Sequence, residues 1–158
     1  RAGICVTTVS IKAEKEITGR SDIIVCADKL FDEVDYEKED VLVLPGGMPG
    51  TTNLQAYEPL VVLLKKFYTE KKMLAAICAA PKVLGQAGLL KGKKATCHRG
   101  FEEELIGATV LEEEVVVDGN IITSRGMGTA IPFGLEVVRY FLDGEAVDKL
   151  VHAMIYRQ

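Results

Sequence analysis

The sequence lacks several features that would assign it at once to a large class of proteins. Its 158 residues carry 19 Lys and Arg against 23 Asp and Glu, and the lysines occur as scattered pairs rather than as a basic tract. This pattern argues against obligate nucleic-acid binding. No apolar run approaches the roughly 20 residues that a membrane-spanning helix needs. We therefore expect a soluble, cytoplasmic protein with no membrane partner.

Cysteine and histidine are too few and too scattered to predict a metal centre. The four cysteines form no C-x-x-C pair, and Cys97 next to His98 has no companion pair that would complete four ligands. Adjacent residues on a strand also face opposite sides, so these two do not converge on one ion. A chain of this length does not need disulfide staples, and we expect reduced thiols.

Short β-branched segments alternate with amphipathic helical patterns along the chain. This alternation predicts a mostly parallel sheet covered by helices on both faces, that is, a three-layer α/β sandwich. A chain of this size predicts one domain over residues 1–158. The Asp-Gly pair inside 115–124 predicts a β-hairpin. We further expect strands at 3–10, 22–28, 40–47, 72–78 and 93–97, and helices at 59–70, 80–90, 100–106, 129–142 and 145–155.

The first three residues, Arg1-Ala2-Gly3, have the pattern of a helix end that precedes a strand. We expect the strand and helix that would come before them to be carried by a separate polypeptide. The alternative is a terminus with nothing lost.

Cys78 follows a continuously apolar strand and precedes Pro81, which favours a helix start. Ligands of open α/β sheets bind where strands end and helices begin, and backbone N–H groups there favour a thiolate over a thiol. The small residues Ala76 and Ala80 flank the cysteine as glycines flank a nucleophile elbow. Cys78 is therefore our candidate nucleophile; the alternative is a buried cysteine that packs as a small hydrophobe.

Three further segments end strands at the same expected edge. Gly46 and Gly47 allow a ligand to approach the backbone and meet its amides, although an ordinary turn has the same residues. His98 is placed to reach a thiolate, whereas His152 lies in a terminal helix where a surface or packing role is expected. The glycine-rich turn at 123–129 either lines a pocket or only connects two elements.

Four motifs together resemble the ThiJ/PfpI superfamily, in particular its small parkinsonism-associated deglycases and glyoxalases. They are "LPGG" (44–47), "AAICAAP" (75–81), "ATCHRGFEEEL" (95–105) and "TSRGMGTA" (123–130), in the family's order and spacing. The resemblance covers essentially the whole chain. It implies a flavodoxin-like, class I glutamine amidotransferase-like sandwich that forms a homodimer.

The resemblance also implies roles for individual residues. Cys78 would be the nucleophile, Gly47 and Ala79 would donate backbone amides to an oxyanion, with Gly46 beside them, and His98 would lie beside the sulfur. Arg1 and Arg20 match arginines that hold an anion near the dimer contact, and Cys26 matches a cysteine close to it. The alternatives are a solvated turn for Arg20 and a packed strand residue for Cys26. Arg99 and Met127 stand where relatives often have proline, which reshapes the pocket rim.

The activity that the resemblance implies is attack of Cys78 on reactive aldehydes such as methylglyoxal, or on glycation adducts, without metal, glutathione or another cofactor. The enzyme would be a glyoxalase or protein deglycase, of the hydro-lyase or hydrolase class. The family's catalytic glutamate has no counterpart in residues 1–158. We expect a separate N-terminal fragment of the same protein to supply it, together with a strand and a helix. An oxidation sensor or holdase chaperone is the main alternative, and a cysteine hydrolase or protease is a further one.

Overall fold

The computed structural model describes residues 1–19 and 21–156. Its helices are α1 (Gly50–Ala56), α2 (Glu58–Thr69), α3 (Pro81–Gln86), α4 (Ala130–Phe141) and α5 (Gly144–Ala153). Its strands are β1 (Val9–Ser10), β2 (Glu16–Thr18), β3 (Ile24–Cys26), β4 (Lys29–Leu30), β5 (Val41–Leu44), β6 (Met73–Ile77), β7 (Lys94–Ala95), β8 (Thr109–Val110), β9 (Val115–Asp118) and β10 (Ile121–Ser124). Four single-turn 3₁₀ helices lie at Phe31–Glu33, Tyr36–Lys38, Glu102–Glu104 and Met127–Thr129.

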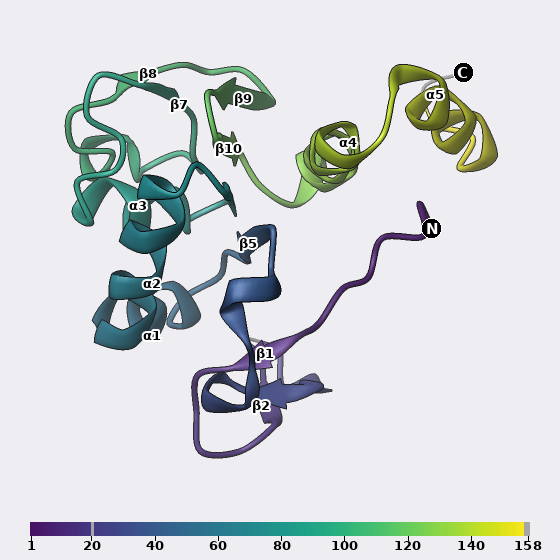
Figure 1. Ribbon diagram of the computed structural model, residues 1–158. Coiled ribbons are helices and arrows are strands. Elements are labelled where there is room, and N and C mark those ends of the chain that lie inside the picture. The colour runs from purple at the N-terminus through teal and green to yellow at the C-terminus, as the bar shows by residue number, and fades with distance from the viewer. Residues whose placement is uncertain (20, 157–158) are drawn as a thin grey trace.

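A four-stranded sheet in the order β5-β6-β10-β9 forms the centre of the molecule. β5, β6 and β10 are parallel, and β9 pairs antiparallel with β10 through the predicted hairpin. In Figure 1, helices α1 to α3 lie on one side of these strands and α4 lies on the other. The helices therefore cover both faces of the sheet, as the alternating sequence pattern predicts.

The alternation of side chains along β6 explains why two separate cores form. Leu74 and Ala76 point into a large core with α2 and α3, whereas Met73 and Ala75 pack with Phe133 of α4. The apolar face of α2 repeats at helical spacing and buries Leu60, Leu63, Leu64 and Phe67. Each such large side chain contributes about 1.5–3 kcal/mol by leaving water. The two cores hold β6 rigidly, and with it the residue that follows.

The remaining strands form small sheets outside this centre. β1 pairs with β4, β2 pairs antiparallel with β3, and β7 pairs with β8. Strands β1 to β4 form a lobe at the lower end of Figure 1. Cys26 ends β3 and is exposed rather than packed in the sheet.

Some predicted elements are shorter than expected. The strand predicted at 3–10 is limited to Val9–Ser10, because a strand needs a pairing partner and residues 3–7 have no backbone partner among the described residues. The helix predicted at 100–106 is wrong beyond one 3₁₀ turn, since Gly100 and Gly107, both with positive φ, bound the segment closely. The helix predicted at 80–90 stops at Gln86, shortly before Gly88 at φ 78°. Helix α1 and strands β2, β4 and β8 were not predicted.

Candidate active site

The parallel strands β5, β6 and β10 end at one edge of the sheet, where Cys78 lies. Leu44 pairs with Ala76, and Ser124 pairs with Ile77, so the residues after these three strands meet. The Cys78 N–H donates to the Ser124 carbonyl oxygen at 2.9 Å, and the Cys78 carbonyl accepts from the His98 N–H at 2.8 Å. Cys78 is thus fixed on both sides by segments distant in the sequence.

The backbone turns sharply at Cys78, where φ is 67°. This left-handed conformation costs a non-glycine residue about 1–2 kcal/mol. It ends β6 and directs the chain into α3, which begins at Pro81. Ala79 and Ala80 after it are buried, and the thiol itself is half-buried. Strain held by well-packed surroundings is found preferentially at functional positions.

Gly46 comes so close to Cys78 that no side chain fits there. A Cβ at Gly46 would lie 2.4 Å from the Cys78 Cβ, 3.1 Å from its Sγ and 2.8 Å from the Ile77 carbonyl oxygen. This approach therefore requires glycine at position 46, whereas at Gly47, where an added Cβ would meet nothing within 4 Å, the backbone φ of 93° favours glycine.

Two backbone amides, on the residues that follow Gly46 and Cys78, remain free to bind a ligand. Within the described residues, neither the Gly47 N–H nor the Ala79 N–H donates a hydrogen bond. The Gly47 carbonyl is held by the Thr51 N–H at 2.8 Å and by the Thr51 hydroxyl at 2.9 Å, which fixes the loop to α1. Preorganised N–H groups of this kind can stabilise an oxyanion.

His98 lies next to this turn on the strand-end segment after β7. Its Nδ1 is 2.9 Å from the Arg99 carbonyl oxygen. Its ring packs edge-on against the Phe101 ring, with the two ring centroids 6.2 Å apart. Because a carbonyl oxygen only accepts, Nδ1 carries the proton, and Nε2 of the neutral ring is left as an acceptor. The ring can therefore receive a proton at Nε2.

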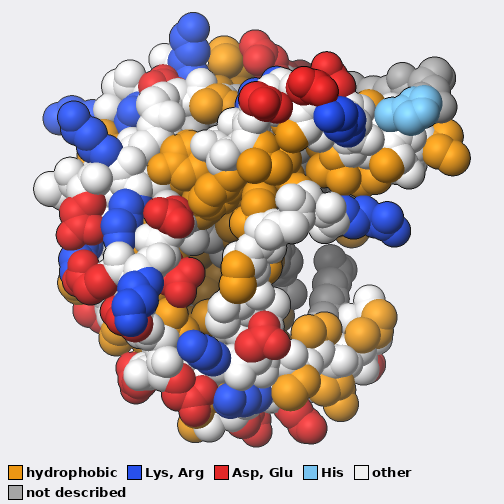
Figure 2. All heavy atoms as spheres, turned by 45° about the vertical axis from the view of Figure 1, so that its right-hand side comes forward, with side chains coloured by type: hydrophobic (Ala, Val, Ile, Leu, Met, Phe, Trp, Pro, Cys, Tyr) orange, Lys and Arg blue, Asp and Glu red, His pale blue; other side chains and the backbone are white. Residues whose placement is uncertain are grey.

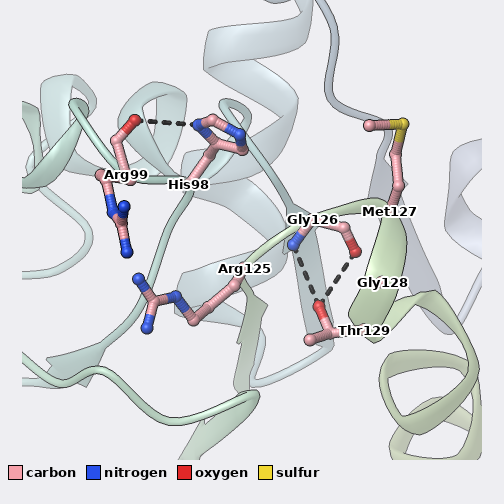
Figure 3. Close-up of a pocket in the computed structure, with 7 residues that line it drawn as sticks. All are labelled: His98, Arg99, Arg125, Gly126, Met127, Gly128 and Thr129. Atoms are coloured by element: carbon pink, nitrogen blue, oxygen red, sulfur yellow. Dashed lines mark hydrogen bonds between the residues drawn. The ribbon is translucent and has the colours of Figure 1, made fainter.

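A cavity of about 430 Å³ opens beside His98 and is shown in Figure 3. The Thr129 hydroxyl accepts the Gly126 N–H at 3.0 Å and bonds the Ser124 hydroxyl at 2.7 Å, which fixes the turn between β10 and α4. Met127 on this turn is 90% exposed. The lining residues are His98, Arg99, Arg125, Gly126, Met127, Gly128 and Thr129.

The structure brings together most residues expected from the sequence. Cys78, Gly46, Gly47 and Ala79 meet at the strand ends, and His98, Arg99 and Met127 follow around the cavity.

One expected arginine takes no part in this cluster, another lies outside the described residues, and one residue was missed. Arg1 is exposed and does not line the cavity, and Arg20 lies outside the described residues. Arg125 belongs to a turn that the sequence marked as a possible pocket wall, yet its charge was not singled out. An arginine directly after a buried strand was the available signal.

Cys97, the residue before His98, is more deeply buried than Cys78. It is buried, and burial, assisted by the nearby Glu102 carboxylate, raises the pKa of its thiol to about 11.

Within the described ranges, no three His, Cys, Asp or Glu side chains are arranged to hold a metal ion. No described helix is both long and apolar enough to span a bilayer.

Comparison with known proteins gives consistent matches. The model of the DJ-1/PfpI family matches residues 1–140. The chain is 37% identical over 159 residues to Protein DJ-1 homolog B of Arabidopsis thaliana, covering 99% of the chain and 36% of that protein. It is 40% identical over 125 residues to Deglycase PfpI of Pyrococcus furiosus, covering 78% of the chain and 75% of that protein. The chain thus spans about a third of the Arabidopsis protein and three quarters of the Pyrococcus one.

Among solved structures, oxidized Toxoplasma gondii DJ-1 matches with a TM-score of 0.93 at 32% identity. The match covers 99% of this chain and 86% of that one. It confirms the flavodoxin-like α/β fold expected from the sequence.

Proposed function

The chain belongs to the DJ-1/PfpI family, as its four motifs predicted, and we propose that it is a cysteine-dependent enzyme acting on reactive aldehydes or their glycation adducts. Relatives named as deglycases support this class of activity. The enzyme would need no cofactor, and methylglyoxal is the test substrate. Cys78 is the nucleophile, and His98 assists it.

One observation carries the proposal: the Cys78 thiol sits on a strained turn beside two free backbone amides. The left-handed φ exposes the thiol at the strand ends, where Gly46 makes room for it. The free N–H groups of Gly47 and Ala79 can receive the oxygen that becomes negative when a thiolate attacks a carbonyl. A cysteine that only packs in a core needs neither feature.

The reaction follows from this arrangement. The Cys78 sulfur attacks the aldehyde carbon, a C–S bond forms, and the carbonyl oxygen takes up the electron pair and then a proton, which gives a hemithioacetal. The hydrogen of that carbon moves as a proton to the neighbouring carbon through an enediol and leaves a thioester. Water then cleaves the C–S bond, which releases lactate and restores the thiol. Nε2 of His98 is an available acceptor, and the family resemblance assigns the main base to a glutamate without a counterpart here.

The test is lactate formation from methylglyoxal by the intact protein. We expect Cys78→Ser to abolish turnover, whereas Cys26→Ser, which removes an exposed cysteine on β3, leaves it unchanged. Turnover by Cys78→Ser at the parental rate would refute the role of the thiol.

An oxidation sensor with holdase activity is the second candidate. It is supported by the solved relative that is described as oxidized, and by the half-buried thiol of Cys78, which peroxide can reach. Mass spectrometry after mild peroxide would locate the oxidised cysteine, and an aggregation assay would measure chaperone activity. A holdase keeps that activity in Cys78→Ala, whereas an aldehyde-processing enzyme loses turnover.

A cysteine hydrolase receives less support. Such an enzyme uses a Cys-His-acid triad, in which the acid orients the imidazole. Among the described residues, the His98 ring bonds to the Arg99 backbone carbonyl instead of a carboxylate.

A strand from a second polypeptide is our proposal for the open side of β5. β5 pairs with β6 on one side only among the described strands, and Val43 in its middle is 49% exposed. Figure 2 shows the molecule deeply hollowed, with hydrophobic side chains gathered on the wall of the hollow. An N-terminal fragment of the same protein, bringing a strand, a helix and the glutamate, fits this edge. Native mass spectrometry of the purified protein should show a second chain, and a spectrum of this chain alone would count against it.

A homodimer through β3 is the second partner proposal. Ile23, Ile24 and Val25 are exposed side by side next to Cys26, which matches a cysteine near the dimer contact of relatives. Such an exposed apolar segment favours association. Sedimentation should give a dimer for the parent and a monomer for Ile24→Glu; a monomeric parent would contradict the proposal.

A further inference from the structure

The cavity beside His98 is positively charged, although the chain as a whole carries a net charge of −4. Two of its seven lining residues are arginines, and none is acidic. Figure 3 shows the Arg99 and Arg125 guanidinium groups pointing toward one another at one side of the cavity. Arg99 comes from the segment after β7 and Arg125 from the end of β10, so only the fold brings the two charges together.

The charge of this pair is only partly neutralised by neighbouring groups. Arg125 donates to the Glu112 carbonyl oxygen at 3.0 Å and lies 3.8 Å from the Glu112 carboxylate, whose side chain is 92% exposed. Arg99 has no side-chain hydrogen bond or ion pair with any described residue. The Glu102 carboxylate lies near both arginines, but it accepts the Gly100 N–H at 2.7 Å and does not line the cavity. One guanidinium is thus anchored, and the other is free to close on a ligand.

We propose that this cavity binds the anionic end of the substrate, so that the preferred substrates are aldehydes or 2-oxo compounds that carry a carboxylate or a phosphate. The proposal rests on the attack by Cys78 proposed above. Guanidinium groups match the two oxygens of such anions with paired N–H donors. The cavity volume falls within the range of small-molecule sites.

The position of the cavity suits this role. His98 lines it, and the His98 backbone N–H is bonded to the Cys78 carbonyl at 2.8 Å. Cys78 itself does not line the cavity, and this backbone hydrogen bond connects the cavity wall to the residue that carries the thiol. A charge held there would orient the carbonyl group of a short substrate toward the sulfur.

The rate of Cys78 alkylation tests the proposal independently of turnover. Iodoacetate and iodoacetamide displace iodide at the same sulfur and differ mainly in charge, and peptide mass spectrometry separates Cys78 from the other cysteines. We expect Arg99→Gln to lower the ratio of the iodoacetate rate to the iodoacetamide rate about three- to fivefold, and Arg99→Glu to lower it further. Rising salt should reduce the ratio in the parent protein.

The matched control is Arg139→Gln, which removes one positive charge from α4 where Arg139 pairs with Glu136. We expect it to leave the ratio at the parental value. Equal ratios for the parent, Arg99→Gln and Arg99→Glu would overturn the anion site, whatever the lactate assay gives. If the parent protein forms no lactate from methylglyoxal, the proposed aldehyde chemistry is refuted, whereas the ratio of the two alkylation rates still tests the anion site. Inorganic phosphate and acetate, each added during the alkylation, distinguish a preference for phosphate from one for carboxylate, because the preferred anion should slow the alkylation of Cys78 by iodoacetate more strongly.

Discussion

Replacement of Gly46 by alanine tests the close approach on which the site depends. The added Cβ would lie 2.4 Å from the Cys78 Cβ and 2.8 Å from the Ile77 carbonyl oxygen. Carbon atoms in contact are normally about 3.5–4.0 Å apart, so the overlap with Cys78 exceeds an ångström. Neither neighbour can give way easily, because β6 is held between β5 and β10 and is buried over most of its length.

The expected cost follows from this overlap. Overpacking of a well-packed site costs about 1–3 kcal/mol in the free energy of unfolding. With a urea dependence of about 1–3 kcal/mol per molar for a small domain, the unfolding midpoint should fall by about 1 M. A thiol displaced by about an ångström should also lose up to about a hundredfold in turnover.

The assay combines urea unfolding, followed by circular dichroism, with lactate formation. The matched control is Gly50→Ala at the start of α1, where an added Cβ meets nothing within 4 Å. We expect Gly50→Ala to unfold at or slightly above the parental midpoint, because alanine favours the helix, and to keep its activity. The reasoning is refuted if Gly46→Ala behaves like Gly50→Ala in both measurements.

Three further changes test other parts of the structure. Because φ at Cys78 is 67°, glycine at this position relieves backbone strain that alanine retains. This relief exceeds the entropic cost of glycine, so Cys78→Gly should be more stable than Cys78→Ala by about 0.5–1 kcal/mol in urea unfolding. Equal stabilities of the two variants would argue against strain. Burial raises the pKa of the Cys97 thiol to about 11, so native Cys97 should react with iodoacetamide at pH 8 at least about a hundredfold more slowly than the exposed cysteines. The reaction rate of Cys97 should rise with pH up to about pH 11. Rapid labelling of Cys97 at pH 8 would contradict this prediction. Gly85→Ala would place a Cβ 2.3 Å from the Glu104 carbonyl oxygen and should lower the free energy of unfolding by about 1–3 kcal/mol. Gly134→Ala in α4 has open space around the added Cβ and should raise the free energy of unfolding by about 0.5–1 kcal/mol. Thermal unfolding that gives the opposite order of stability would contradict both predictions.

Elements whose pattern is local could be predicted from the sequence. The apolar spacing of α2 and α4, the Asp-Gly hairpin and the buried strand β6 all carry their signals within a few residues. The order of the four motifs likewise identified the family. These features need only short-range periodicity and turn chemistry, which the sequence contains in full.

Elements that depend on distant partners could not be predicted in the same way. The strand at 3–10 is limited to two residues because pairing partners decide how far a strand extends. The helix predicted at 100–106 was instead wrong for a local reason, because glycines with positive φ bound the segment at both ends.

The sequence by itself determined the family and the candidate nucleophile through short contiguous motifs in a fixed order, and the layered fold through the alternation of local strand and helix patterns. The tertiary structure alone decided the left-handed turn at Cys78, its close approach to Gly46, and the placement of Arg99 and Arg125 around one cavity beside His98. These arrangements bring together the ends of β5, β6, β10 and the segment after β7, and no periodicity along a chain specifies the distance between the ends of separate strands.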